Sequence, residues 1–125
     1  MKKLLALILA LTMLLCLCGC QPKVENDGSQ KTFTVTVVHR DGTSKDFTYT
    51  SDKTYVGEVL QAEGLIAGNM GQYGLEIHTV DGEKAVYTED KAYWAIYEGE
   101  EYALQGIDAT PIRDGGVYKL VYTLA

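Results

Sequence analysis

Short stretches in which apolar and polar residues alternate run from residue 32 to the end of the chain, and they constrain the fold more than any other feature. In 32–39, Phe33, Val35 and Val37 fall on one side and three threonines on the other. β-branched and aromatic residues at a period of two are typical of a strand with one buried face. Further strands are predicted at 44–50, 75–83, 93–97, 100–104 and 117–124.

One segment, residues 51–64, has helical spacing instead. Val56, Val59 and Leu60 stand at i, i+3 and i+4, which gives a short helix one apolar stripe. Thr54 is the expected N-cap, and Gly64 is the expected residue just beyond the C-terminus. Because a helix of about nine residues is unstable alone in water, it must pack on the sheet.

The predicted order is two strands, one helix and then several strands. Asp41-Gly42 and Asp81-Gly82 are hairpin-turn signals, whereas residues 64–74, with four glycines, are expected to form a loop. This order predicts an α+β roll in which one helix lies across a mixed sheet. If the last strand lies beside the first, the topology is β-grasp-like, and this is the fold that we expect.

The N-terminus has the pattern of an export signal. Two lysines precede the uncharged apolar run 4–17, which at 14 residues is shorter than the roughly 20 that a membrane-spanning helix needs. The run ends in Leu17-Cys18-Gly19-Cys20, which resembles the lipobox of bacterial lipoproteins. By that resemblance, residues 1–19 are a signal peptide and Cys20 carries lipid. A plain secretory signal and an uncleaved membrane anchor are the alternatives.

The remaining chain divides into a tether and a single domain. Residues 20–31 are the lipidated cysteine and a polar stretch with Pro, Gly and Ser, which reads as a flexible linker. Residues 32–125 are of a length that fits one domain. The predicted location is therefore the outer face of a bacterial membrane, with the protein held through the lipid on Cys20.

Charge and missing motifs exclude several functions. The net charge of −6 becomes −8 when the two lysines of the signal leave, so nucleic acid is not an expected partner. No cysteine follows Cys20, and the sequence has no phosphate-binding glycine loop, no serine nucleophile elbow and no His-x-x-x-His pair. We therefore expect no enzyme, no catalytic residue, no metal site and no cofactor.

The two histidines are weak signals by themselves. His39 ends the first strand, and His78 lies opposite Leu75 and Ile77 if its strand alternates cleanly. A single histidine could ligate the cobalt of a corrinoid, but a sheet or surface histidine is the commoner case.

The stretch 91–107 holds the only Trp of the chain and three of its nine Tyr. We expect a hairpin that turns at Glu98-Gly99. The candidate ligand-binding residues are Tyr93, Trp94, Tyr97 and Tyr102. Either these rings are ordinary packing of a small sheet, or alternate residues form a flat platform for a ligand, a use that suits large, stiff side chains with a polar edge. On size, we expect Trp94 and Ile96 on the buried side.

The pattern as a whole resembles the bacterial lipoprotein domain family DUF4430, which is related to the C-terminal β domain of transcobalamin and intrinsic factor. The resemblance covers residues 32–124. It rests on the hairpin at Asp41-Gly42 and on the stretches TYVGEVLQAEG, IHTVDGE, YWAIYEGEEYALQGI and RDGGVYKLVY. The chain departs from the family in having Glu98-Gly99 where Asn-Gly is usual, and it has no room for the helical domain of the vertebrate carriers.

The resemblance implies a function outside the cell. A family relation to cobalamin carriers implies a membrane-anchored binding module for a corrinoid or another flat small molecule, with cobalamin as a ligand and not as a cofactor. The alternative is a protein-interaction or adhesion module that acts through its sheet edge by β-augmentation.

Overall fold

The computed structural model describes residues 28–125, so the predicted signal peptide, Cys20 and most of the predicted tether lie outside the described residues. The strands are β1 (Lys31–Val38), β2 (Ser44–Ser51), β3 (Ile66–Gly71), β4 (Gly74–Val80), β5 (Glu83–Lys84), β6 (Ala92–Glu98), β7 (Glu101–Tyr102) and β8 (Val117–Leu124). The helices are α2 (Val56–Ala62), α3 (Tyr87–Asp90) and the 3₁₀ turn η1 (Ile107–Ala109). Within residues 28–125, no helix is both long and apolar enough to cross a membrane.

The main sheet has five strands in the order β2-β1-β8-β6-β7, and a second sheet has the order β3-β4-β5. β1 pairs with β2 in an antiparallel hairpin and with β8 in parallel, from Thr34 opposite Val117 to Val38 opposite Val121. The first and last strands are thus central neighbours. The α+β prediction is confirmed, and the parallel pairing is the one that defines a β-grasp-like topology.

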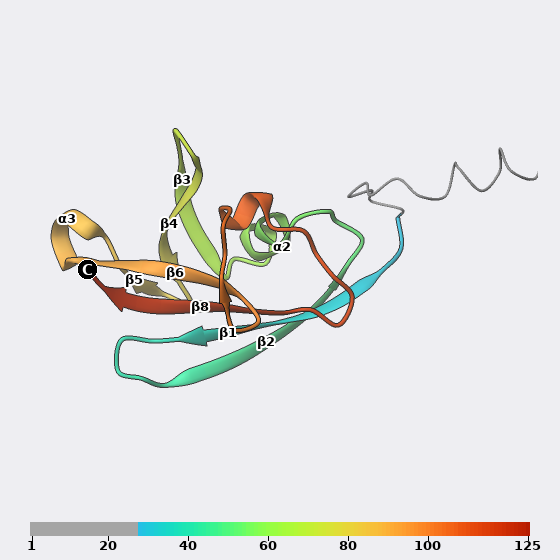
Figure 1. Cartoon of the computed structure of the whole chain (residues 1–125), viewed down its shortest axis with the longest axis horizontal. Coiled ribbons are helices and arrows are strands. Elements are labelled where there is room, and N and C mark those ends of the chain that lie inside the picture. Colours follow the sequence, from blue (N-terminus) through green and yellow to red (C-terminus); the bar gives the residue numbers. More distant parts are fainter. Residues whose placement is uncertain (1–27) are drawn as a thin grey trace, which may run out of the picture.

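The core lies between the main sheet and α2, and Figure 1 shows α2 over one face of that sheet. Phe33, Val35 and Val37 are buried as their alternation predicts, and they face the buried helix residues Val56 and Leu60. The opposite face of the β1–β2 hairpin carries hydrogen-bonded pairs of polar side chains, beginning with the threonine hydroxyls at positions 32 and 50. The period-two pattern therefore separated core from surface correctly.

The N-terminal end of α2 differs from the prediction, whereas its C-terminal end agrees with it. The N-cap is Tyr55, not Thr54, and no side chain caps the helix. The first amide, that of Val56, instead donates to the backbone oxygen of Thr110 at 2.9 Å. At the other end Gly64 has φ of 75°, and the Leu65 amide donates to the Leu60 oxygen, a glycine-dependent C-terminal cap.

The predicted loop at 64–74 is wrong, because residues 66–71 form strand β3, which pairs with β4. Gly68 explains the error. A Cβ at Gly68 would lie 2.2 Å from the backbone oxygen of Glu76, so glycine here permits close approach of two strands. In Figure 1 this β3–β4 hairpin projects away from the main sheet beside α2.

The aromatic segment forms a hairpin as predicted, but its turn lies one residue later than the expected Glu98-Gly99, because Glu98 is still paired in the strand. β6 pairs with β7 through Tyr97 opposite Tyr102 and Glu98 opposite Glu101, which leaves Gly99 and Glu100 as the turn. β7 has two residues and is shorter than the predicted strand 100–104. On its other side, β6 pairs with β8 along its whole length.

Candidate functional site

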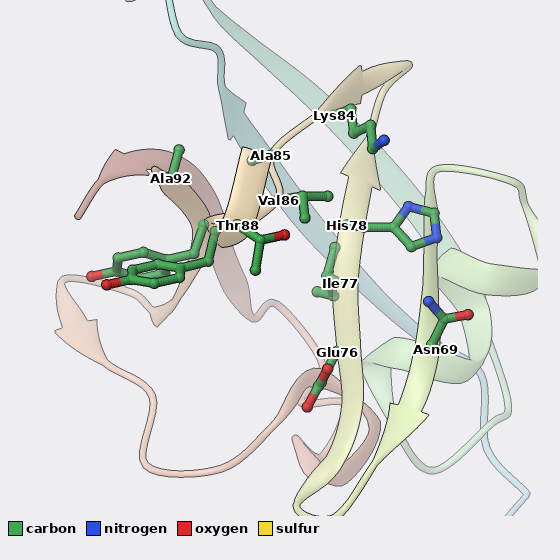
Figure 2. Close-up of a pocket in the computed structure, with 11 residues that line it drawn as sticks. Asn69, Glu76, Ile77, His78, Lys84, Ala85, Val86, Thr88 and Ala92 are labelled. Atoms are coloured by element: carbon green, nitrogen blue, oxygen red, sulfur yellow. The ribbon is translucent and has the colours of Figure 1, made fainter. Parts of the chain in front are cut away.

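A pocket of about 670 Å³ opens between the second sheet, α3 and the start of β6 (Figure 2). Its lining residues are Asn69, Glu76, Ile77, His78, Lys84, Ala85, Val86, Tyr87, Thr88, Ala92 and Tyr93. A smaller pocket of about 420 Å³ lies at the β6–β7 turn and is lined by Tyr55, Glu98, Tyr102 and Arg113, among others. The larger pocket combines apolar walls with a few polar groups, which is typical of small-molecule sites.

The polar wall of the larger pocket depends on a β-bulge. Ala67 pairs with Thr79, but Gly68 pairs with Ile77, so His78 is an extra residue on β4. Bulges redirect a side chain and break the alternation of the strand. The buried residues of β4 are accordingly Leu75 and Val80, with Ile77 packed against the core. The expected clean alternation around His78 is therefore wrong.

His78 is held by its neighbour on the strand. Its Nδ1 atom lies 2.7 Å from the hydroxyl oxygen of Thr79, and residues 28–125 provide no hydrogen-bond partner for its Nε2 atom. In Figure 2, His78 and Asn69 lie over the β3–β4 hairpin. This arrangement leaves one imidazole nitrogen free to contact a ligand.

The opposite wall is mostly apolar and aromatic. Val86, Thr88 and Ala92 lie across β4 from His78 in Figure 2. Tyr87 is 62% exposed and Tyr93 is 38% exposed, so both rings retain surface that a ligand could cover. Two exposed aromatic side chains at the rim of a pocket offer contact area at little entropic cost.

The short helix α3 shapes this wall. The Asp90 carboxylate accepts a hydrogen bond from the Val86 amide at 2.9 Å, which closes the turn of the helix. Lys84 donates to the Glu89 carboxylate at 2.8 Å, and this bond raises the pKa of Lys84 above its usual value. The lysine that lines the pocket is therefore paired with a carboxylate.

Of the four predicted aromatic residues, Tyr93, Tyr97 and Tyr102 lie together on one side of β6 and β7, whereas Trp94 lies on the other. Tyr93 lines the larger pocket, whereas Tyr102 lines the smaller one. Tyr97 packs edge-on against Tyr102, with ring centroids 5.5 Å apart. Partial burial, followed by the neighbouring Tyr93 and Tyr97 hydroxyls, raises the pKa of Tyr102. Trp94 is 5% exposed and belongs to the core.

Most residues of the larger pocket were missed by sequence reasoning. They come from β4, β5 and α3, and residues 76–78 and 84–88 carry no motif that marks a site. The one available signal was Gly68, because a glycine inside a strand pattern often marks a bulge next to a functional side chain.

The fold and the pocket define a class, namely a small α+β domain of β-grasp-like topology with a lateral pocket at its second sheet. No family model and no curated protein matches the chain. Among solved structures, a crystal structure from Ruminococcus gnavus ATCC 29149 is described as a "putative metal binding protein". It shares 40% identity over 76% of this chain and 98% of its own, with a TM-score of 0.72. The chain belongs to the same family as that protein.

Haptocorrin, solved in complex with Cbi, is a more distant neighbour. It shares 17% identity over 81% of this chain, with a TM-score of 0.58, and the match spans 27% of haptocorrin. This similarity shows the fold alone. The relation to cobalamin carriers therefore stays a prediction, and so does membership in DUF4430, because no family model matches.

The described residues offer no evident site for a metal ion. Residues 28–125 contain no group of three or more His, Cys, Asp or Glu side chains placed to hold one. His39 lies between Asp81 and Glu83, but both of its ring nitrogens are engaged with these carboxylates, each at 2.9 Å. That arrangement is a hydrogen-bonded cluster and not a set of free ligands.

Proposed function

We propose that this protein is a lipid-anchored, non-catalytic binding module on the outer face of a bacterial membrane. It takes a flat small molecule, for which a corrinoid is the leading candidate, in the pocket between β4, α3 and β6. The observation that carries the proposal is the pocket of about 670 Å³, which lies within the range of roughly 300–1,000 Å³ usual for small-molecule sites.

The two walls of the pocket suit a flat ligand with polar edges. Tyr87 and Tyr93 provide aromatic surface, and Asn69, Glu76 and His78 provide polar atoms. An imidazole nitrogen is also a common ligand of a metal ion. If the ligand is a corrinoid, the Nε2 atom of His78 is the group in this pocket to test as a ligand of its cobalt.

The two similar structures support a small ligand, but they do not identify the ligand of this protein. Haptocorrin was solved with Cbi, that is cobinamide, and the family member from R. gnavus is described in terms of metal binding. A cobalt-containing corrinoid would be compatible with both descriptions. In this chain it would be cargo and not a cofactor.

An absorbance titration with cobinamide and with cobalamin tests the proposal. Tyr93→Ser removes an aromatic wall and His78→Ala removes the imidazole, so each should weaken binding, and only His78→Ala should also change the cobalt spectrum if Nε2 ligates the metal. Tyr73→Ser, at a 90% exposed tyrosine that does not line this pocket, is the matched control. If neither corrinoid binds in the millimolar range, the corrinoid proposal is wrong.

Protein interaction through a sheet edge is the second candidate. β7 pairs only with Tyr97 and Glu98, so within the described residues the outer edge of β6 at 92–95 has no strand partner. An extended peptide could add there by β-augmentation. β2 is a longer free edge, but Lys45 and Asp46 place charges on it, and charged side chains discourage edge pairing. Binding of a peptide that is unaffected by Tyr93→Ser would favour this candidate.

A further inference from the structure

Two hairpin turns from different sheets meet at His39. The residue follows β1 in the first hairpin, and its ring lies against the turn between β4 and β5. Its Nε2 atom is 2.9 Å from Asp81 Oδ2, and its Nδ1 atom is 2.9 Å from Glu83 Oε1. The His39 side chain is 18% exposed, so these contacts are partly shielded from water. The Arg40 amide also donates to Glu83 Oε1 at 2.9 Å.

The chemistry of these contacts requires a charged imidazole. A carboxylate only accepts hydrogen bonds, and imidazole has an N–H on both nitrogens only when it is protonated. A neutral His39 would donate to one carboxylate and would direct a ring lone pair at the other. Both 2.9 Å contacts can therefore be hydrogen bonds only in the imidazolium form.

The two carboxylates in contact with His39 favour that charged form against the effect of burial. From its own turn, Arg40 extends over the Tyr122 ring of β8, and Asp41 is hydrogen-bonded to Thr43. From β6, Trp94 faces the imidazole edge-on at 6.2 Å, and it carries no charge. The hydrogen bond to Asp81 raises the pKa of His39 above 6.5; burial opposes the rise, and Glu83 adds to it.

Beyond the direct contacts, the surroundings add one acid, Glu63, and one phenol, Tyr49. Tyr49 of β2 has a raised pKa, first from burial and then from the charges of Glu63 and Asp81, which places it near this cluster. Arg40, by contrast, is a nearby side chain that carries a positive charge. The surroundings of His39 are therefore acidic on balance.

The contact matters for the pocket because β5 is short and leads directly into the pocket wall. β5 pairs with β4 only through Thr79 opposite Lys84 and Val80 opposite Glu83. The Ala85 amide adds one bond to the His78 oxygen at 2.8 Å. Lys84, Ala85 and the next residue are part of the pocket wall. An anchor at Glu83 thus fixes the start of that wall to the main sheet.

We propose that protonated His39 is a latch that fastens the β4–β5 turn to the main sheet and keeps the pocket wall ordered. The latch holds at acidic pH and releases at alkaline pH. The direction follows from linkage, because the pKa of His39 is raised in the folded protein. Such a group stabilises the latched structure fully below its unfolded pKa, about 6.5, and this stabilisation is lost as the pH rises through the folded pKa. The consequence for ligand binding rests on the proposed function, whereas the latch itself does not.

The test uses the ligand-free protein. NMR titration of the two imidazoles gives the pKa of His39, and hydrogen exchange of the Ala85 amide, corrected for intrinsic rate, reports the order of the wall. If the pKa of His39 is one unit higher in the folded protein than in the unfolded one, the protection factor of Ala85 should fall tenfold between acidic and alkaline pH. Each further unit should add another factor of ten. The Val35 amide, in the central strand β1, is the internal reference.

Two variants make the result specific. His39→Gln should remove the pH dependence of Ala85 exchange, whereas His78→Gln, which changes the other histidine, should leave it. A pKa of His39 at or below 6.5, or Ala85 protection that follows Val35 at every pH in the unmodified protein, would overturn the latch. The unmodified protein alone gives these readouts, so poor folding of a variant does not block the test.

A binding titration at pH 6 and pH 9 then separates the two proposals. Weaker cobinamide binding at pH 9, absent in His39→Gln, supports control of the pocket by the latch. Equal binding at both pH values, together with a change in Ala85 exchange, would refute that control and leave the latch. No cobinamide binding at either pH, with the exchange result intact, would overturn the proposed function and not the latch.

Discussion

Replacing Trp94 with Ala tests the division of β6 into a core side and a pocket side. The Trp94 ring is 5% exposed and packs edge-on against Tyr122 and His39, at centroid distances of 5.5 and 6.2 Å. Its indole Nε1 is buried and, within residues 28–125, has no hydrogen-bond partner. The substitution therefore removes a large apolar contact and one unsatisfied donor together.

The two effects have opposite signs. Burying a Trp side chain removes about 150–250 Å² from water, or about 4–6 kcal/mol at roughly 25 cal/mol per Å². An unsatisfied buried donor costs about 1–3 kcal/mol. We expect Trp94→Ala to lower the free energy of unfolding by about 3 kcal/mol, at the lower end of the usual range for such changes. For a domain of this size, that is a fall in Tm of roughly 12–24 °C.

Urea unfolding followed by circular dichroism is the appropriate assay, because the substitution removes the only Trp and with it the fluorescence signal. Trp94→Phe keeps most of the ring contact and eliminates the orphaned N–H, so its cost should be less than half that of Trp94→Ala. Tyr93→Ala, at the next position and on the open side, is the matched control and should cost below about 1 kcal/mol. A larger loss for Tyr93→Ala than for Trp94→Ala would invert the assignment of faces.

Three further predictions concern the helix, the bulge and the anchor. Leu60→Ala should cost about 2–5 kcal/mol in urea unfolding because Leu60 is fully buried, while exposed Gln61→Ala should stay within about 0.5 kcal/mol; a similar cost for both would remove α2 from the core. Gly68→Ala places a Cβ 2.2 Å from the Glu76 oxygen, so it should destabilise by about 1–3 kcal/mol and perturb the His78 NMR signals; an unchanged His78 environment would contradict the role of the bulge. Cys20→Ala should abolish lipid modification and membrane partitioning, and a variant with the same processing and added mass would disprove the lipobox interpretation.

The sequence predicted the main sheet and the helix because their signals are local and repeated. Phe33, Val35 and Val37 alternate over a full strand, and Val56 and Leu60 share a helical stripe, so each element indicates its own buried face. The parallel pairing of first and last strands was expected only conditionally, since nothing local encodes which strands become neighbours.

What the sequence missed depends on contacts between distant segments. The start of α2 needs no side-chain cap, because the chain at 110–112 runs beside it and supplies the Thr110 oxygen, while the Ile112 amide donates to the Thr54 oxygen. Tertiary pairing replaced the expected hydroxyl at Thr54. Likewise, the four glycines of 64–74 indicate loop by propensity, but the geometry at Gly68 shows a strand whose partner comes unusually close.

The pocket was hidden from sequence reasoning for a related reason, and β6 shows why the aromatic stretch alone could not reveal it. Neighbours on a strand face opposite sides, so Tyr93 reaches the pocket while Trp94, one residue later, packs beneath the His39 ring. The same strand thus supplies part of the pocket wall through Tyr93 and, through Trp94, packs against His39, which contacts the turn before β5. A change at Trp94 should therefore disturb the pocket indirectly, through His39, whereas a change at Tyr93 should disturb it only directly. Measuring the pKa of His39 in Trp94→Phe and in Tyr93→Ser distinguishes these routes: it should shift in the first variant and stay constant in the second.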